Sequence, residues 1–291
     1  MSTKPTIGFV GTGVMGVSMA GHLLDSGYEM HVFNRTKERA APLVDSGAVW
    51  HETPGDVAAA TDVVITIVGF PNDVEQVYFG SDGILDNIRS GSIVVDMTTS
   101  EPALAKRIYE EAKSKGVSAL DAPVSGGDTG AREARLSIMV GGDKDTFDTI
   151  LPLFEIMGKN IVLQGPAGSG QHCKMCNQIA IASGMLGVCE AIAYAYDSGL
   201  DPETVLTSIA TGAAGSWSLS NLAPRMIAGN FDPGFFVKHF IKDMRIAAES
   251  SKDLDLDTPG LSLALSMYEK LASEGGESNG TQALLKLYRT E

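Results

Sequence analysis

The chain has 291 residues, more than one ordinary domain holds, so two domains are expected. Its residues are 44% hydrophobic and 20% charged, which is typical of a packed globular protein rather than of a disordered chain or a repeat array. The formal net charge of −14 repels phosphate backbones and anionic lipid surfaces, so neither nucleic acid nor membrane is expected as a partner. An anionic ligand therefore needs local positive charge.

The cysteines and the amino terminus indicate a reducing, cytoplasmic setting. Cys173, Cys176 and Cys189 are odd in number, which favours reduced thiols over a disulfide framework. Cys173 and Cys176 form a CxxC pair, but no further ligand stands at metal-binding spacing, so no metal site is predicted and the pair is interpreted as ordinary helix side chains. The opening MSTKP leads directly into a short apolar run and leaves no room for a secretory signal.

Short apolar runs alternate with helix-like segments along the first half of the chain. Each run is apolar throughout, as expected for strands buried on both faces of a sheet. This alternation predicts a doubly wound, mostly parallel α/β sheet of the Rossmann class. The expected strands are 6–10, 30–33, 63–68, 93–96, 118–120, 136–140 and 161–163, and the helix candidates include 14–25, 37–46, 101–114 and 144–157.

The strand pattern ends near Gln164, where GPAGSG supplies a joint rich in helix and strand breakers. We therefore predict a dinucleotide-binding domain over 1–164 and an all-α domain over 165–291. Residues 170–198 are expected to form one long helix that is apolar on most sides and hence buried. Further helices are predicted after the Asp201-Pro202 capping pair and over 238–250 and 258–273.

The motif GTGVMG comprises Gly11, Thr12, Gly13, Val14, Met15 and Gly16, and it follows the first strand and opens the first helix. Gly11 permits the tight turn, Gly13 lets the backbone approach a pyrophosphate, and Gly16 allows close helix-to-strand packing. An ordinary glycine turn is the alternative. The flanking strand and helix favour dinucleotide binding.

The second expected strand is followed by Asn34, Arg35 and Thr36, where NAD enzymes usually place an acidic residue that binds the ribose hydroxyls. No carboxylate stands in this segment to repel a phosphate, while Arg35 can pair with one and Thr36 can donate a hydrogen bond. NADP is therefore the favoured cofactor. The alternatives are that NAD serves equally well and that the segment is only a solvated, basic helix start.

Two polar clusters follow later strands. Thr99 belongs to DMTTS at 96–100, whose hydroxyls either face the cofactor or only cap the next helix. Ser125, Gly126 and Gly127 belong to DAPVSGG, whose backbone amides suit a carboxylate, although a plain turn uses the same residues.

Lys174 is followed by Asn177 and Gln178 at helical spacing, so the three side chains share one helix face. A lysine on an apolar helix is costly unless it is used. Desolvation and a neighbouring oxidised nicotinamide push such an amine towards its neutral form, which makes it a usable general base. The alternative is a lysine whose amine extends to the surface.

The chain resembles the β-hydroxyacid dehydrogenases, a group that includes 3-hydroxyisobutyrate dehydrogenase and tartronate semialdehyde reductase. The resemblance rests on GTGVMG, DMTTS, DAPVSGG, the GxGxxxK segment that ends at Lys174, and Lys242-Asp243 in HFIKDM, all in family order. It implies hydride transfer between NADP and a small hydroxy acid or its semialdehyde, in a homodimer or homotetramer with a Rossmann domain and an all-α domain.

The resemblance also implies residue roles. Lys174 corresponds to the proton-transfer lysine, and Ser125, Gly126 and Gly127 to the loop that holds the substrate carboxylate. Asn177 and Gln178 correspond to substrate contacts, Thr99 to the threonine near the nicotinamide, and Lys242 to a lysine that reaches cofactor or substrate. Gln178 departs from several relatives, which have Asn there, and Trp217 replaces a smaller residue, so the shape of the pocket stays open.

Three other functions compete with this interpretation. Imine reductases share the two-domain fold but typically lack a lysine at the position of Lys174. A 6-phosphogluconate dehydrogenase has a longer helical region and a His-Asn pair after its lysine. A non-catalytic dinucleotide-binding protein would keep GTGVMG and lose the proton-transfer group. Lys174 thus argues against the first and the last.

Overall fold

The computed structural model describes residues 4–289, and the chain divides into two compact units, Met1–Lys174 and Met175–Glu291. The division falls inside one long helix, later in the chain than the junction predicted after residue 164. Each unit is described by itself.

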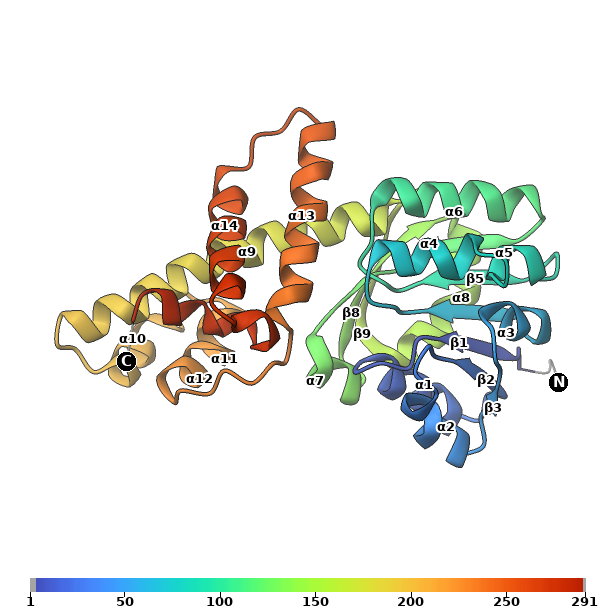
Figure 1. Cartoon of the computed structure of the whole chain (residues 1–291), viewed down its shortest axis with the longest axis horizontal. Coiled ribbons are helices and arrows are strands. Elements are labelled where there is room, and N and C mark those ends of the chain that lie inside the picture. Colours follow the sequence, from blue (N-terminus) through green and yellow to red (C-terminus); the bar gives the residue numbers. More distant parts are fainter. Residues whose placement is uncertain (1–3, 290–291) are drawn as a thin grey trace. The chain divides into compact units, whose positions relative to one another are not determined.

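The first unit is built on a nine-stranded sheet with the order β3-β2-β1-β4-β5-β6-β8-β7, and β9 pairs with β8 (Figure 1). The strands are β1 (Ile7–Val10), β2 (Met30–Phe33), β3 (Val49–Trp50), β4 (Val63–Thr66), β5 (Ile93–Asp96), β6 (Ser118–Asp121), β7 (Val124–Ser125), β8 (Leu136–Gly142) and β9 (Gly158–Gly165).

Most neighbouring strands are parallel, which confirms the predicted Rossmann class; β8 is antiparallel to β6 and to β7. The order from β3 to β6 reverses at β1, and ligands of such sheets bind at the carboxyl ends of the strands beside this reversal.

Helices cover both faces of this sheet. They are α1 (Gly16–Asp25), η1 (Lys37–Ala40), α2 (Ala41–Asp45), α3 (Pro54–Ala60), α4 (Pro71–Phe79), α5 (Ile84–Asn87), α6 (Pro102–Ser114), α7 (Gly127–Arg132) and α8 (Lys144–Met157). The predicted helix over 37–46 therefore begins as a 3-10 turn, and α3, α4, α5 and α7 were not predicted.

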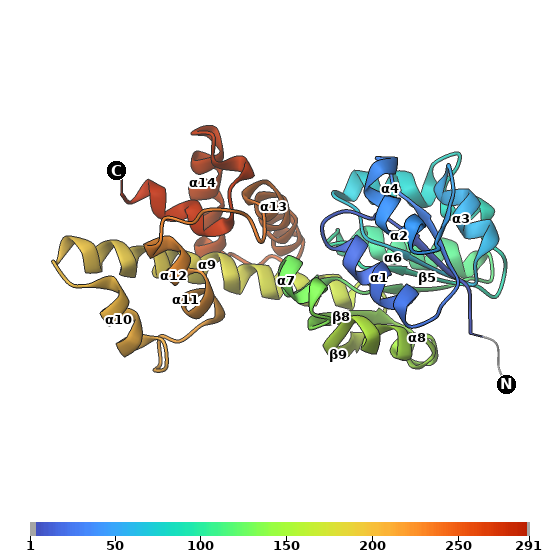
Figure 2. The same ribbon diagram turned by 90° about the horizontal axis from the view of Figure 1, so that it is seen from below.

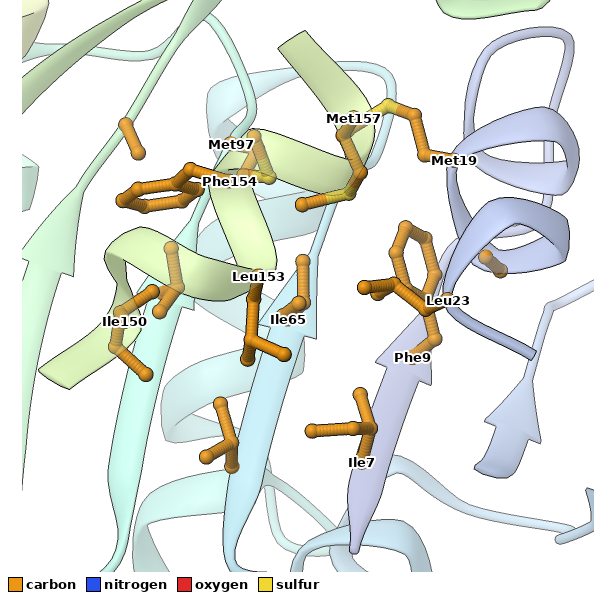
Figure 3. Close-up of a cluster of buried hydrophobic side chains, with 14 of the residues drawn as sticks. Ile7, Phe9, Met19, Leu23, Ile65, Met97, Ile150, Leu153, Phe154 and Met157 are labelled. Carbon is orange, nitrogen blue, oxygen red and sulfur yellow. The ribbon is translucent and has the colours of Figure 1, made fainter. Parts of the chain in front are cut away.

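Side chains that alternate along each strand feed two separate cores. On one face, strand residues such as Phe9 and Ile65 pack with Leu23 of α1 and Phe154 of α8 (Figure 3). On the other face, Val64 and its neighbours pack against α3, α4, α5 and α6. This burial on both faces explains why the strands are apolar throughout rather than alternating.

The second unit is helical throughout the described residues, as predicted. It contains the larger part of α9 (Ser169–Asp197), then α10 (Pro202–Ile209), α11 (Trp217–Asn221), α12 (Ala223–Ile227), α13 (Val237–Asp253), α14 (Pro259–Ser273), η2 (Gly276–Ser278) and η3 (Thr281–Leu287). Within this unit, Figure 2 shows the pair α13 and α14 on one side of α9 and α10 to α12 on the other. Their apolar side chains form one core around Met185, Phe240 and Tyr268.

Helix α9 is 29 residues long and apolar enough to span a bilayer by length and composition, a test that core helices of non-membrane proteins also pass. Burial on most sides was the wrong expectation, because only 44% of its most apolar window is buried. Cys176, Ala180, Gly184 and Gly187 lie exposed along one side of this helix.

Candidate active site

The predicted ligand-binding segments of the first unit leave the sheet at one common edge. The last residues of the parallel strands are paired in register: Val10 with Phe33 and Thr66, Thr66 with Asp96, and Asp96 with Asp121. The glycine motif, the segment 34–36, the segment 97–100 and the segment 122–127 all follow these residues. The sheet therefore gathers segments that are far apart in the sequence.

The three glycines of the turn are under different steric constraints. Gly11 has a φ of +100°, and a Cβ atom there would lie 2.1 Å from the carbonyl oxygen of Ile67. A Cβ on Gly16 would lie 2.0 Å from the carbonyl oxygen of Gly11, so this position accepts only glycine. A Cβ on Gly13 would meet nothing within 4 Å. Gly13 alone is thus not required by the protein's own packing, which is what close approach of a ligand predicts.

Thr12 and Asn34 tie the glycine turn to the end of β2. The backbone N–H of Thr12 donates to Oδ1 of Asn34 at 3.0 Å, and Nδ2 of Asn34 donates to the carbonyl of Thr36 at 2.7 Å. The hydroxyl oxygen of Thr12 is buried and has no hydrogen-bond partner within the described chain. Val14 and Met15 complete the turn, with Val14 61% exposed. Asn34 therefore supports the turn itself.

Arg35 extends into solvent, with 82% of its side chain exposed, and one guanidinium nitrogen lies 3.0 Å from Oδ1 of Asp73. Asp73 stands in the first turn of α4, where its other oxygen accepts the backbone N–H of Phe70 at 3.1 Å. The sequence has no carboxylate beside Arg35, but the fold brings the carboxylate of Asp73 next to it. This exposed ion pair is weak, so a phosphate can compete for the guanidinium.

The segment that contains Thr99 is held from inside the sheet by Asp96. One oxygen of the Asp96 carboxylate accepts the hydroxyl of Thr66 at 2.8 Å and the backbone N–H of Thr98 at 3.1 Å. The hydroxyl oxygen of Thr98 accepts the backbone N–H of Val68 at 3.0 Å. Burial raises the pKa of Asp96 to about 6, against the hydrogen bonds that favour the carboxylate. Thr99 itself is half-buried.

Lys174 lies in the second turn of α9 and is only 6% exposed. Its ammonium nitrogen donates to the carbonyl of Val124 at 2.9 Å. The amine therefore lies inside the protein, at the residue that precedes Ser125, rather than in solvent. Ser125 ends β7, Gly126 has a φ of +138°, and Gly127 begins α7. The structure thus brings the predicted proton-transfer amine beside the predicted carboxylate loop.

Asp121 fixes the beginning of the helix that carries Lys174. One of its carboxylate oxygens accepts the N–H of Gly168 at 2.7 Å and the other accepts the N–H of Gln171 at 2.8 Å. A Cβ on Gly170 would lie 2.4 Å from the carbonyl oxygen of Met139, so glycine lets this helix end approach the sheet. Burial raises the pKa of Asp121, and these backbone N–H groups oppose that rise. Asp121 belongs to the DAPVSGG segment named from the sequence, but neither its anchoring role nor any role of Gln171 was predicted.

The remaining predicted residues lie in the second unit. Nδ2 of Asn177 donates to Oε1 of Gln178 at 2.6 Å, and Nε2 of Gln178 donates to Oδ2 of Asp243 at 2.6 Å. The ammonium nitrogen of Lys242 lies 3.0 Å from Oδ1 of Asp243. Gln178 is 1% exposed, and its amide joins α9 to α13. A substrate contact by Gln178 stays a prediction.

Two protein families match this chain. The family described as the NAD binding domain of 6-phosphogluconate dehydrogenase matches residues 6–165, and the one described as NAD-binding of NADP-dependent 3-hydroxyisobutyrate dehydrogenase matches residues 168–288. The chain belongs to the β-hydroxyacid dehydrogenase family. It is therefore an NAD(P)-dependent 3-hydroxyacid dehydrogenase.

Individual members of the family match this dehydrogenase over nearly its whole length. An uncharacterized oxidoreductase of Bacillus subtilis is 61% identical over 98% of this chain and 99% of its own. The 2-hydroxy-3-oxopropionate reductase of Escherichia coli is 39% identical over 96% of each chain. The solved structure of Mycobacterium tuberculosis 3-hydroxyisobutyrate dehydrogenase with L-serine has a TM-score of 0.91 and 28% identity, over 99% of this chain and 100% of that one.

The first unit fits a nicotinamide dinucleotide on its own geometry. Helix α1 has neither a capping side chain nor an acidic residue in its first turn, so its positive end is left for an anion. The open space at Gly13 and the buried, unpartnered hydroxyl of Thr12 lie in the same turn. Across residues 4–289 no group of three or more His, Cys, Asp or Glu side chains is arranged to hold a metal ion.

The glycine turn predicts that two similar substitutions affect different properties, one cofactor binding and the other stability. Gly13→Ala enters open space, so its thermal unfolding should match wild type while its Kd for NADPH rises about tenfold or more, which is about 1.4 kcal/mol. Gly16→Ala collides with the backbone of Gly11 and should lose about 1–3 kcal/mol of stability. Calorimetry and NADPH fluorescence titration measure both; unchanged NADPH affinity of Gly13→Ala contradicts the assignment.

The raised pKa of Asp96 predicts a pH-dependent gain in stability on neutralisation. The folded state binds the Asp96 proton more tightly than the unfolded state does, so the contribution of Asp96 to stability falls as pH rises from about 4 to above 6. Asp96→Asn keeps the shape without the charge, so it should gain little at pH 4 and about 3 kcal/mol at pH 8. Urea unfolding at both pH values tests this, with exposed Asp82→Asn as control; an equal effect at both values contradicts it.

Proposed function

We propose that this dehydrogenase uses NADP and moves a hydride between the nicotinamide and a small β-hydroxy acid or its semialdehyde, with Lys174 as the general acid and base. The observation that carries the proposal is the buried ammonium of Lys174 at the carbonyl of Val124, directly before the Ser125-Gly126-Gly127 segment. A lysine placed on this helix merely for solubility would extend to the surface.

The chemistry asked of Lys174 is the movement of one proton. When bound, the nicotinamide supplies or accepts the hydride. As the neutral amine, Lys174 accepts the hydroxyl proton of the substrate during oxidation; as the ammonium, it donates a proton to the carbonyl oxygen during reduction. The carbonyl of Val124 holds the amine in place and accepts one of its hydrogen bonds.

The proposed substrates share a carboxylate and a hydroxyl or carbonyl group on a short carbon chain. The Escherichia coli relative is named for 2-hydroxy-3-oxopropionate, and the Mycobacterium tuberculosis structure contains L-serine, both of which are small acids of this kind. The backbone amides of Gly126 and Gly127, with the hydroxyl of Ser125, are proposed to bind the carboxylate. In the second unit, Asn177 and Lys242 are proposed as contact residues for substrate and cofactor, and Gln178 and Asp243 hold their side chains.

The NADP preference rests on Arg35 and Thr36 after β2. The family matched over residues 168–288 is described as NADP-dependent, which agrees with this preference. Arg35 can leave its ion pair with Asp73 and form one with a phosphate. Use of NADP favours reduction of the semialdehyde as the direction of the reaction in the cell. NAD is the alternative, because Asp73 places a carboxylate next to the same guanidinium.

The proposal also covers the competing functions, the oligomeric state and the location of the enzyme. The buried amine of Lys174 disfavours both an imine reductase and a non-catalytic dinucleotide-binding protein, neither of which needs a lysine there. A homodimer or homotetramer in the cytoplasm is the proposed state of the enzyme.

A steady-state screen tests the function. Wild type should oxidise NADPH with at least one of glyoxylate, tartronate semialdehyde and succinic semialdehyde. Lys174→Met keeps the length of the side chain without its amine, so kcat should fall about 10²- to 10⁴-fold while NADPH still binds. Lys144→Ala, at an exposed lysine of α8, is the control. Turnover retained by Lys174→Met removes this lysine from the mechanism.

The Arg35–Asp73 pair predicts opposite shifts in cofactor preference. Arg35→Ala should raise the Kd for NADPH about tenfold with little change for NADH. Asp73→Asn removes the competing charge and should tighten NADPH by about two- to fivefold. Arg107→Ala, which breaks a similar exposed pair with Glu75, should change neither constant. Equal effects of Arg35→Ala on NADPH and NADH would show that Arg35 does not select the phosphate.

A further inference from the structure

The side chain of Gln171 is fully buried, and no role was predicted for it from the sequence. It lies in the first turn of α9, three residues before Lys174. Its Nε2 donates to the carbonyl of Thr98 at 2.7 Å, and its Oε1 accepts the N–H of Ser100 at 3.0 Å. One amide thus binds the backbone on both sides of Thr99.

This double contact crosses a long stretch of sequence. Gln171 is separated from Thr98 and Ser100 by 73 and 71 residues, and all of these residues lie in the first unit. The backbone N–H of Gln171 is itself fixed by Asp121 at the end of β6. Gln171 therefore connects two strand ends, that of β5 through the bonds of its side chain to residues 98 and 100 and that of β6 through the bond of its backbone N–H to Asp121.

We propose that Gln171 is a positioning residue for the hydride-transfer reaction, which holds the backbone of Thr99 at a fixed place relative to the helix that carries Lys174. This inference rests on the proposed function. Lys174 and Gln171 share one stretch of helix, and Thr99 is held by the Gln171 amide at both flanking peptide groups. Displacement of the segment 98–100 would move the predicted nicotinamide contact while Lys174 stayed at Val124.

The bonds of the Gln171 side chain can be removed without disturbing the helix anchor. The bond from its backbone N–H to Asp121 survives any side-chain substitution except proline. Gln171→Met has a similar size and removes both amide bonds, which isolates their contribution. If Gln171→Met does not fold, the shorter Gln171→Asn gives the same comparison, because its amide cannot reach both Thr98 and Ser100.

The matched control is Gln282 in the second unit. It is 1% exposed, and its Nε2 donates to the carbonyls of Asn230 and Asp232 at 3.1 and 3.0 Å. Gln282→Met removes buried bonds from a glutamine to the backbone, as Gln171→Met does, and it touches no residue of the candidate site. A general loss of stability should affect both variants alike.

Hydrogen exchange, steady-state kinetics and an isotope effect test the proposal. In Gln171→Met, amide hydrogen exchange at Ser100 should accelerate about tenfold. With the best substrate of the screen, kcat should fall about tenfold to a hundredfold, with a smaller change in KM for NADPH. The kinetic isotope effect with NADPH deuterated at the transferred position should increase, because hydride transfer becomes slower than product release. Gln282→Met should leave all these quantities at wild-type values.

Unchanged exchange at Ser100 would overturn the proposal, and so would a fall in kcat that Gln282→Met reproduces. Failure of the proposed function is distinguishable: wild type would then turn over no member of the substrate panel. In that case exchange at Ser100 alone decides whether Gln171 holds the segment.

Discussion

The structure of the candidate site depends on the carboxylate of Asp121. Its two oxygens accept the N–H of Gly168, directly before α9, and the N–H of Gln171 in the first turn of α9, so the end of a sheet strand is bonded directly to the beginning of the helix that carries Lys174. A carboxylate at this end of a helix also interacts favourably with the helix dipole. Gly168 and Gly170 make the approach sterically allowed.

From that anchor the polar contacts spread along the edge of the sheet. The side chain of Gln171 bonds to residues 98 and 100, and the carboxylate of Asp96 accepts the N–H of Thr98 in the same segment. The hydroxyl of Thr98 in turn accepts the N–H of Val68, which follows β4. These groups are buried, and each contact satisfies a backbone group that would otherwise be costly to bury. The network therefore stabilises the fold and fixes the site at the same time.

The second unit has a comparable arrangement of its own. Asp243 on α13 accepts a hydrogen bond from Gln178 on α9 and pairs with Lys242, while Gln178 also binds Asn177. A buried acid thus organises predicted contact residues in each unit.

The sequence by itself determined the strand pattern, the glycine turn, the helical second half and the family, because these depend on local periodicity, turn chemistry and motifs of adjacent residues. It also predicted Lys174 as the proton-transfer residue, and the structure places this amine, buried, at the carbonyl of Val124. Only the tertiary structure showed the pairing of Arg35 with Asp73, the hydrogen bonds of Asp121 to the beginning of α9, and the two hydrogen bonds of the Gln171 amide to residues 98 and 100. Those contacts join residues that are tens of positions apart, and they arise because parallel strands end at one edge of the sheet, which no local pattern records.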